Sequence, residues 1–135
     1  MGVAANQARL MTLTARQHDL ELRAQQISAM KMIKTMESQA MAIAYSDGLT
    51  EYSKMKSGEL TKTGGTKYSD SECSSYLDTI KSTYDLATTA ISSEEKILDM
   101  ELTQINTEHT AIKTEYDAVK SLISDNVEKS FNVFG

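Results

Sequence analysis

The sequence contains no proline and no tryptophan, and only one of its 135 residues is a cysteine. A chain without proline and with only six glycines lacks the turn residues on which a β-sandwich or β-barrel depends. Its single cysteine, Cys73, leaves no internal disulfide framework and no multi-cysteine metal site. The sequence has no apolar run of the length that a transmembrane helix requires. Its first residues lack the apolar core of a secretory signal peptide, so Sec-type export is not expected.

The charged residues are unevenly distributed along the chain, whose net charge is −5. Residues 1–46 carry five Lys/Arg and three Asp/Glu, whereas residues 86–135 carry four Lys/Arg and nine Asp/Glu. An acidic chain with a mildly basic start lacks the concentrated cationic face that nucleic acid requires, so no nucleic-acid partner is expected. The segregation of charge instead favours attraction between the two ends of the chain, or between copies of it.

Residues 6–46 predict one long helix. They contain no glycine or proline and are dominated by good helix formers. Apolar residues recur at spacings of mostly three and four, which indicates a helical stripe; they are Leu10, Leu13, Leu20, Ala24, Ile27, Met30, Ile33, Met36, Ala40 and Met41. We expect Asp47-Gly48 to end the helix, because glycine takes the left-handed C-terminal cap. Such a helix would be roughly 60 Å long and needs a partner along its length.

A coiled-coil seam is the clearest pattern in the second half of the chain. Two series with seven-residue intervals form its d and a positions, namely Ile91, Leu98, Ile105, Ile112 and Val119, and Leu102, His109, Tyr116 and Ile123. The sequences Ser69-Asp70-Ser71-Glu72 and Ser92-Ser93-Glu94-Glu95 resemble capping boxes, which start helices or reinforce them. We therefore expect a shorter helix at about 71–90, which either ends there or runs straight into the last helix.

Two ladders of charge favour an antiparallel pairing of the two long helices. Each has seven-residue spacing at the g position, and they consist of Arg9, Arg16 and Arg23 and of Glu94, Glu101, Glu108 and Glu115. The g flanks of antiparallel helices face each other, so these residues are candidate helix-pairing residues. Heptad spacing fixes the register only in steps of seven, and we place Arg23 near Glu108 and Arg16 near Glu115. An exposed pair contributes about 0.2–1 kcal/mol, and for any single pair the alternative is two solvated charges.

Between the two helical patterns, residues 47–72 form a polar insert rich in Ser, Thr, Lys and Gly. Gly64-Gly65 would turn a small β-hairpin, and a loop is the alternative. The predicted fold is therefore all-α. It is a long antiparallel helical hairpin in one domain of residues 1–135, made of an N-terminal helix (1–46), the insert (47–72) and a C-terminal helical region (73–135).

No catalytic, cofactor-binding or metal site is expected. Neither His18 nor His109 has a second histidine or a cysteine at ligand spacing, and Cys73 has no nearby histidine. Glu108 and His109 are adjacent, so their side chains point in different directions on a helix. We therefore predict that the protein is not an enzyme and has no cofactor and no small-molecule substrate.

Two groups of apolar residues are candidate contact surfaces. The methionines Met30, Met32, Met36 and Met41 indicate either core packing or an adaptable surface for a partner. Phe131 and Phe134 are the only phenylalanines, and they stand three apart near the C-terminus. Aromatic residues at such a position favour an assembly contact, either on the first helix or on another subunit.

The layout of two long terminal helices around a Ser/Thr/Gly insert resembles the flagellin and flagellar rod and hook group, and also the hairpin subunits of type III secretion needles. Residues 13–28, LTARQHDLELRAQQIS, are similar to the N-terminal axial motif of the flagellar group, but Ala29-Met30-Lys31 replaces its Asn-rich continuation. The opening ANQARLMTLTAR also looks like that of short bacterial proteins of no established function. In the filament families the terminal helices pair and build the filament core, and the insert faces outward.

This resemblance implies a structural, self-assembling bacterial subunit of a helical filament or of a flagellar or secretion-type appendage. Such a subunit has further copies of itself as its partner and reaches the cell surface or the exterior without a signal peptide. The alternative is a cytoplasmic coiled-coil adaptor or export chaperone that binds a partner helix on its Met-rich stripe.

Overall fold

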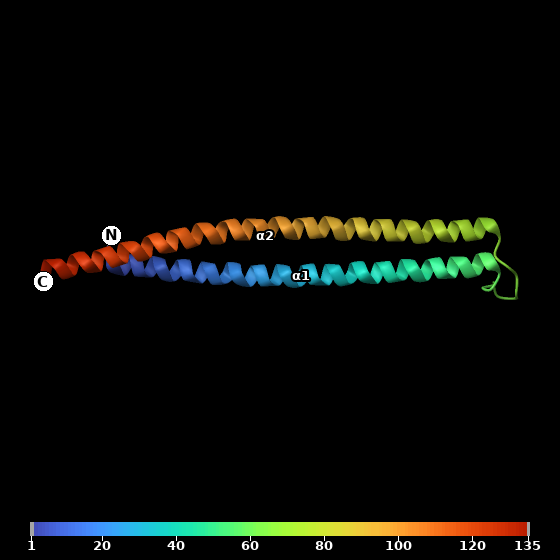
Figure 1. The fold of residues 1–135 in the computed structure, drawn as a ribbon, viewed down its shortest axis with the longest axis horizontal. Coiled ribbons are helices and arrows are strands. Elements are labelled where there is room, and N and C mark those ends of the chain that lie inside the picture. Colours follow the sequence, from blue (N-terminus) through green and yellow to red (C-terminus); the bar gives the residue numbers. More distant parts are fainter. Residues whose placement is uncertain (1, 135) are drawn as a thin grey trace. The chain divides into compact units, whose positions relative to one another are not determined.

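The computed structural model describes residues 2–134, and their side chains as far as Lys129. It contains two helices, α1 (Val3–Ser57, 55 residues) and α2 (Asp70–Phe134, 65 residues), which are joined by residues 58–69 (Figure 1). The helices pack against each other as a helical hairpin, which confirms the all-α prediction. Two compact units share these helices, and we describe each separately. The terminal unit comprises residues 1–29 and 98–135, and the loop unit comprises residues 30–97.

The core of the terminal unit is the seam that the seven-residue pattern predicts. One cluster joins Leu13 to Ile112 and Val119, and a second joins Ile27 to Leu98 and Ile105. The predicted d positions of α2 are therefore buried, and the predicted a positions Leu102, Tyr116 and Ile123 pack half-buried beside them. Burial of branched apolar side chains along both helices supplies the hydrophobic stabilisation that one isolated helix lacks.

The α1 side of the seam keeps strict seven-residue spacing into the loop unit. After Leu13, Leu20 and Ile27, the residues turned toward α2 are Lys34, Met41, Gly48 and Met55, all buried or half-buried. Of the predicted stripe beyond Ile27, only Met41 lies in the seam, and the prediction is wrong for Met30, Ile33, Met36 and Ala40, which are exposed. The physical reason is that the antiparallel partner selects a face with a period of seven, and these four residues lie on another face.

Gly48 lies inside α1, and the prediction that it ends the helix is wrong. The backbone of Gly48 is packed so closely on α2 that a Cβ atom there would lie 2.5 Å from Ile80 Cγ2. Glycine at this position therefore permits close approach of the two helices. The helix ends instead at Ser57, and the next residue, Gly58, has φ 85° and donates its N–H to the Met55 carbonyl at 3.4 Å.

The connection between the helices is shorter than the predicted insert of residues 47–72. It spans residues 58–69 and turns at Gly64 and Gly65, which have φ values of 99° and 85°. A single bridge joins Thr61 to Lys67, and residues 2–134 contain no strand, so the predicted β-hairpin is not supported. A two-stranded hairpin alone is marginal in water, and this loop is too short to bury one against the helices.

The start of α2 confirms one predicted capping box. Ser69 Oγ accepts the backbone N–H of Glu72 at 3.1 Å and donates to Glu72 Oε1 at 3.1 Å. Lys62 Nζ also donates to Glu72 at 2.5 Å, and this ammonium lowers the pKa of the Glu72 carboxyl. No helix begins at the second capping box, because α2 runs unbroken through residues 92–95.

The many threonines are accommodated within the helices by hydrogen bonds to the preceding turn. Thr103, Thr107, Thr110 and Thr114 each donate their hydroxyl to the carbonyl four residues earlier, at 2.9–3.0 Å. The same bond recurs in α1, for example from Thr14 to Leu10 at 2.9 Å. These hydroxyls are therefore satisfied within their own helix.

Candidate helix-pairing and assembly surfaces

The Arg and Glu ladders face each other in the terminal unit, in a register shifted from the predicted one. Arg9 forms an ion pair with Glu115, and Arg23 Nη2 lies 3.1 Å from Glu101 Oε2. The predicted pairs, Arg23 with Glu108 and Arg16 with Glu115, are therefore wrong by one heptad. Packing of Leu13 on Ile112 and Val119 sets the register, whereas charge spacing alone is compatible with any shift of seven.

Arg16 and Glu108 occupy matching positions in this register, midway between the two pairs. Within the described part of the chain, no ion pair joins them at 4.0 Å or less. The four paired side chains are 36–53% exposed. Solvent screening makes such pairs weak, so the ladders select orientation and register more than they stabilise the hairpin.

The remaining predicted assembly residues, Phe131 and Phe134, belong to the last turn of α2. Their side chains lie outside the described residues, so their role as contacts stays a prediction.

A histidine–glutamate contact, which the spacing rules did not predict, joins the helices of the terminal unit. His109 is half-buried at its seam position, and its Nε2 lies 3.3 Å from Glu21 Oε1. His18 Nδ1 lies 3.7 Å from the other oxygen of the same carboxylate. Glu21 belongs to none of the seven-residue series in the sequence. Only the register of the two helices therefore identifies it as a neighbour of His109.

An ion cluster at Lys34 in the loop unit was also not predicted from the sequence. The side chain of Lys34 is 22% exposed and forms ion pairs with Glu94 of α2 and with Glu37, whose Oε2 lies 3.2 Å away. The hydrogen bond to Glu94, followed by the one to Glu37, raises the pKa of the Lys34 ammonium. The seven-residue spacing does indicate this seam position, because Lys34 continues the series of Leu13, Leu20 and Ile27. A charged residue in a seam reduces the apolar burial there and favours one partner register.

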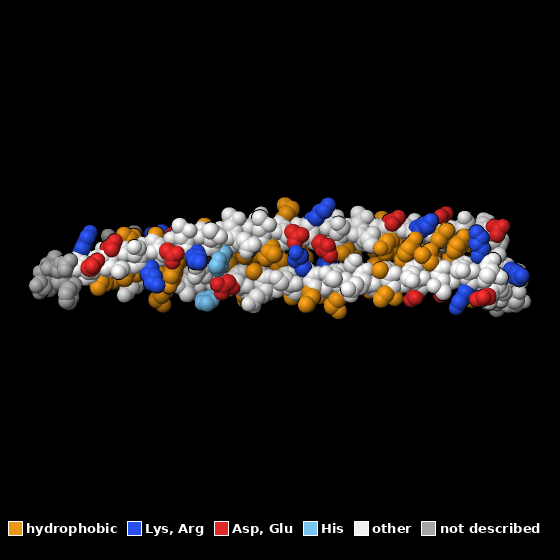
Figure 2. Space-filling model, in the orientation of Figure 1, with side chains coloured by type: hydrophobic (Ala, Val, Ile, Leu, Met, Phe, Trp, Pro, Cys, Tyr) orange, Lys and Arg blue, Asp and Glu red, His pale blue; other side chains and the backbone are white. Residues whose placement is uncertain are grey.

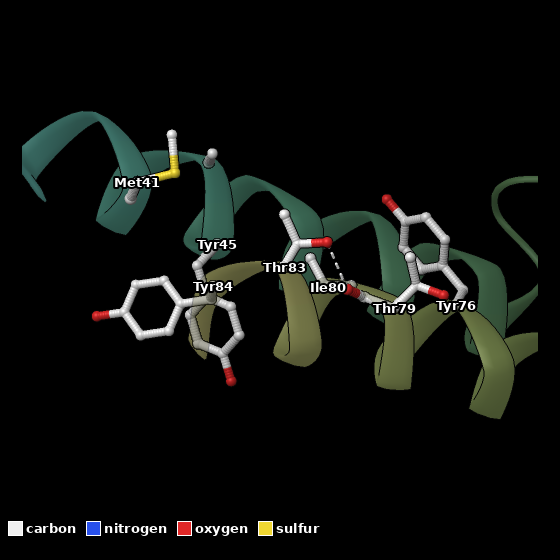
Figure 3. Close-up of a pocket in the computed structure, with 8 residues that line it drawn as sticks. Met41, Tyr45, Tyr76, Thr79, Ile80, Thr83 and Tyr84 are labelled. Atoms are coloured by element: carbon white, nitrogen blue, oxygen red, sulfur yellow. Dashed lines mark hydrogen bonds between the residues drawn. The ribbon is translucent and has the colours of Figure 1, made fainter. Parts of the chain in front are cut away.

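A tyrosine-lined groove lies between the two helices of the loop unit and has a volume of about 150 Å³ (Figure 3). Met41 and Tyr45 approach it from α1, and Ile80 and Tyr84 approach it from α2. The rings of Tyr45 and Tyr84 stack with centroids 4.6 Å apart. Tyr76 also lines the groove and donates its hydroxyl to Glu51 of α1.

A second apolar stripe runs along α1 on a face that α2 does not cover. We call it the outward stripe, and it consists of Ile33, Met36, Ala40 and Ile43. Ile33, Met36 and Ile43 are 53%, 64% and 62% exposed, and Ala40 is exposed as well. In the space-filling view of the loop unit, hydrophobic side chains lie both between the helices and on their outer sides (Figure 2). The three-four-three spacing of the stripe is that of a helix-packing seam.

Two residues of the outward stripe, Ala40 and Ile43, lie in a stretch of α1 without charge, whereas Lys34 and Glu37 are the chain neighbours of Ile33 and Met36. Residues 38–46, SQAMAIAYS, contain no acidic or basic residue, and the same holds for residues 86–93 of α2, LATTAISS. Solvent-exposed helix faces normally carry charged side chains opposite their buried stripe.

Comparison of the chain with protein-family models, with curated proteins and with solved structures found no match. Over the described residues, neither helix has a segment both long and apolar enough to cross a membrane.

Proposed function

We propose that this protein is a structural subunit that self-assembles through its helices into a bacterial filament or a flagellar or secretion-type appendage. The observation that carries the proposal is the outward stripe of α1. Monomeric soluble proteins rarely leave a contiguous apolar patch exposed without a use for it. An exposed stripe with seam spacing is the pattern that packs on another helix. The proposed partner is therefore another copy of the chain.

The free energy of association through the outward stripe favours a stable assembly only when the contact is repeated or extended. Full burial of one isoleucine or methionine side chain contributes about 1.5–3 kcal/mol, and the stripe residues are already partly covered by their own helix. Four such residues give one pair of copies a modest affinity, because association also costs rigid-body freedom. A regular assembly repeats the contact in every subunit, and this supports a filament over an isolated pair.

The layout of the hairpin and its resemblance to flagellar and needle subunits support the remaining parts of the proposal. They are a bacterial source, export without a signal peptide and a location at or beyond the cell surface. In this proposal the loop at residues 58–69 faces away from the assembled helices, as the insert does in the filament families.

A second candidate function is a cytoplasmic coiled-coil adaptor or export chaperone. The exposure of Met30, Met32 and Met36, at 39%, 68% and 64%, favours it. Methionine side chains adapt their shape to different partners, and flexible apolar surfaces of this kind bind helices of varied sequence. This candidate predicts a defined complex with a partner helix rather than a polymer.

Negative-stain microscopy of the purified protein at increasing concentration distinguishes the two functions. We expect regular polymers from the wild type and none from Met36→Glu, which places a charge in the outward stripe. Met11→Glu is the matched control, because Met11 is a 74% exposed methionine of the same helix outside the stripe. Polymers that persist in Met36→Glu would contradict the role of the stripe. A wild type that stops at a dimer or binds only a partner helix would favour the adaptor.

A further inference from the structure

We infer that a charged layer in the seam of the loop unit, formed by Lys34 of α1 and by Glu94 and Glu95 of α2, selects both the register and the partner of α1. The inference concerns the pairing of helices within one chain, and it does not depend on the proposed self-assembly. A charged residue at a seam position lowers the stability of a coiled coil, but it specifies the register and the partner.

The contacts of the loop unit place Lys34 opposite the two acidic residues. Tyr45 and Tyr84 stack with ring centroids 4.6 Å apart, which defines the register at that point. Eleven residues, about three turns, lead along each helix from this stack to Lys34 on α1 and to Glu95 on α2. The Lys34 ammonium forms an ion pair with the neighbouring Glu94. The Lys34 side chain is 22% exposed and Glu95 is half-buried, so both charges lie within the seam.

A slip of the two helices by one heptad would break the charged layer in either direction. In one slipped register Glu95 would lie opposite Ile27, and in the other it would lie opposite Met41. A carboxylate that faces an apolar side chain in a seam loses hydration and gains no partner. Lys34 would lose Glu95 in both cases. Each slipped register therefore carries a cost that the observed register avoids.

The other periodic features of the helices discriminate less between these registers. The Glu ladder repeats every seven residues, so after one slip Glu101 would replace Glu94 as the ion-pair partner of Lys34. The apolar members of the α2 seam also recur every seven residues and are similar in size. Glu95 has no such substitute in the loop unit, because every other acidic residue in residues 70–97 is exposed. The charged layer is therefore the feature that a slip cannot reproduce.

The seam charges of the loop unit also favour α2 over a second α1 as the partner. Among the buried and half-buried residues of α1 at 30–57, the charged ones are Lys31 and Lys34, and none is acidic. Among those of α2 at 70–97, Glu95 alone is charged. Two α1 seams would therefore bring lysines together, and two α2 seams would bring glutamates together. Like charges at an interface are costly, so the layer also specifies the pairing of α1 with α2.

Distances between two spin labels test the inference in the full-length chain. Labels on Ser53→Cys and Ile97→Cys in a Cys73→Ser background report the register, because both positions are exposed and they are offset by several turns. A slip of one heptad changes this offset by about 10 Å along the helix axis. Dilution with excess unlabelled protein removes distances between copies. We expect one distance in this labelled background, and a lower melting temperature together with a second distance in Lys34→Glu.

Two double variants and one control separate register from stability. Lys34→Glu with Glu95→Lys restores opposite charges, so we expect it to recover the single original distance. Lys34→Leu with Glu95→Leu keeps an apolar seam and is expected to fold, with a higher melting temperature and a second distance. Ser38→Leu is the matched control, because it adds apolar surface at a half-buried seam position and leaves the charged layer intact. It should keep one distance.

The outcomes are distinct for register and for stability alone. A single unchanged distance in both Lys34→Glu and the double leucine variant would overturn the inference, because a merely structural role changes the melting temperature without moving the labels. A second distance that persists after charge exchange, or that also appears in Ser38→Leu, would overturn it too. None of these outcomes depends on polymer formation, so the inference and the proposed function fail separately.

Discussion

Ile27 and Ile33 provide a matched test of which face of α1 packs on α2. Ile27 is fully buried, at 0% exposure, between Leu98 and Ile105, whereas Ile33 is 53% exposed. Truncation of isoleucine to alanine removes three carbons, each worth about 0.8 kcal/mol when buried, which gives about 2.4 kcal/mol at Ile27. The cavity that remains increases this loss, and such substitutions cost about 2–5 kcal/mol in total. At Ile33 about half of the surface is already in water, so the expected loss is about 1 kcal/mol or less.

The free energy of unfolding of Ile27→Ala and Ile33→Ala is to be measured by urea denaturation at a concentration where the wild type is monomeric. At that concentration, contacts between copies do not contribute to the result. The higher helix propensity of alanine benefits both variants equally, so it cancels in the comparison. Equal losses at the two positions, or a larger loss at Ile33, would refute the assignment of the outward stripe to an uncovered face.

Three further predictions concern the loop unit. Gly48→Ala should destabilise the hairpin by about 1–3 kcal/mol, despite the better helix propensity of alanine, because the new Cβ overlaps Ile80; a gain in thermal stability would contradict the close approach. Because Lys62 lowers the pKa of Glu72, the stabilisation from Glu72 is complete above the ordinary glutamate pKa of about 4.3 and is lost as pH falls through the lowered value. The stability difference between wild type and Glu72→Gln should therefore vanish in acid, and a pH-independent difference in melting temperature would exclude this ion pair as its source. A short epitope inserted after Gly64, where an added Cβ atom would meet nothing within 4 Å beyond its chain neighbours, should leave the circular dichroism signal unchanged, whereas a loss of helicity would show that the loop is required for folding.

The sequence predicted the fold where one periodic pattern dominated. The seven-residue series from Ile91 to Val119 identified the buried face of α2, because each position in it is branched and apolar. The Ser69–Glu72 capping box located the start of α2, since its side chains and backbone atoms are close in sequence. Both are local signals, and both were sufficient without knowledge of the partner helix.

The remaining features depend on contacts between the helices, and the sequence of one helix does not determine them. Gly48 resembled a helix end until the proximity of Ile80 explained it as a packing site. The Arg and Glu ladders indicated the correct orientation, but the register depended on which buried layers meet. The sequence does not distinguish Lys34 as a seam residue, because the apolar residues Met30, Ile33 and Met36 also recur at helical spacing. The partner helix in fact selects the positions spaced by seven, including a lysine, and leaves Ile33 and Met36 outside.

The proposed self-association through the outward stripe is tested most directly by sedimentation velocity of the wild type and Ile43→Glu over a wide range of concentration. We predict that the wild-type sedimentation coefficient rises with concentration, while Ile43→Glu stays at the monomer value with unchanged helicity. The charge prevents burial of the stripe but leaves the seam between α1 and α2 untouched, because Ile43 is 62% exposed. A wild type that remains monomeric at every concentration, or an Ile43→Glu variant that associates equally well, would contradict the account.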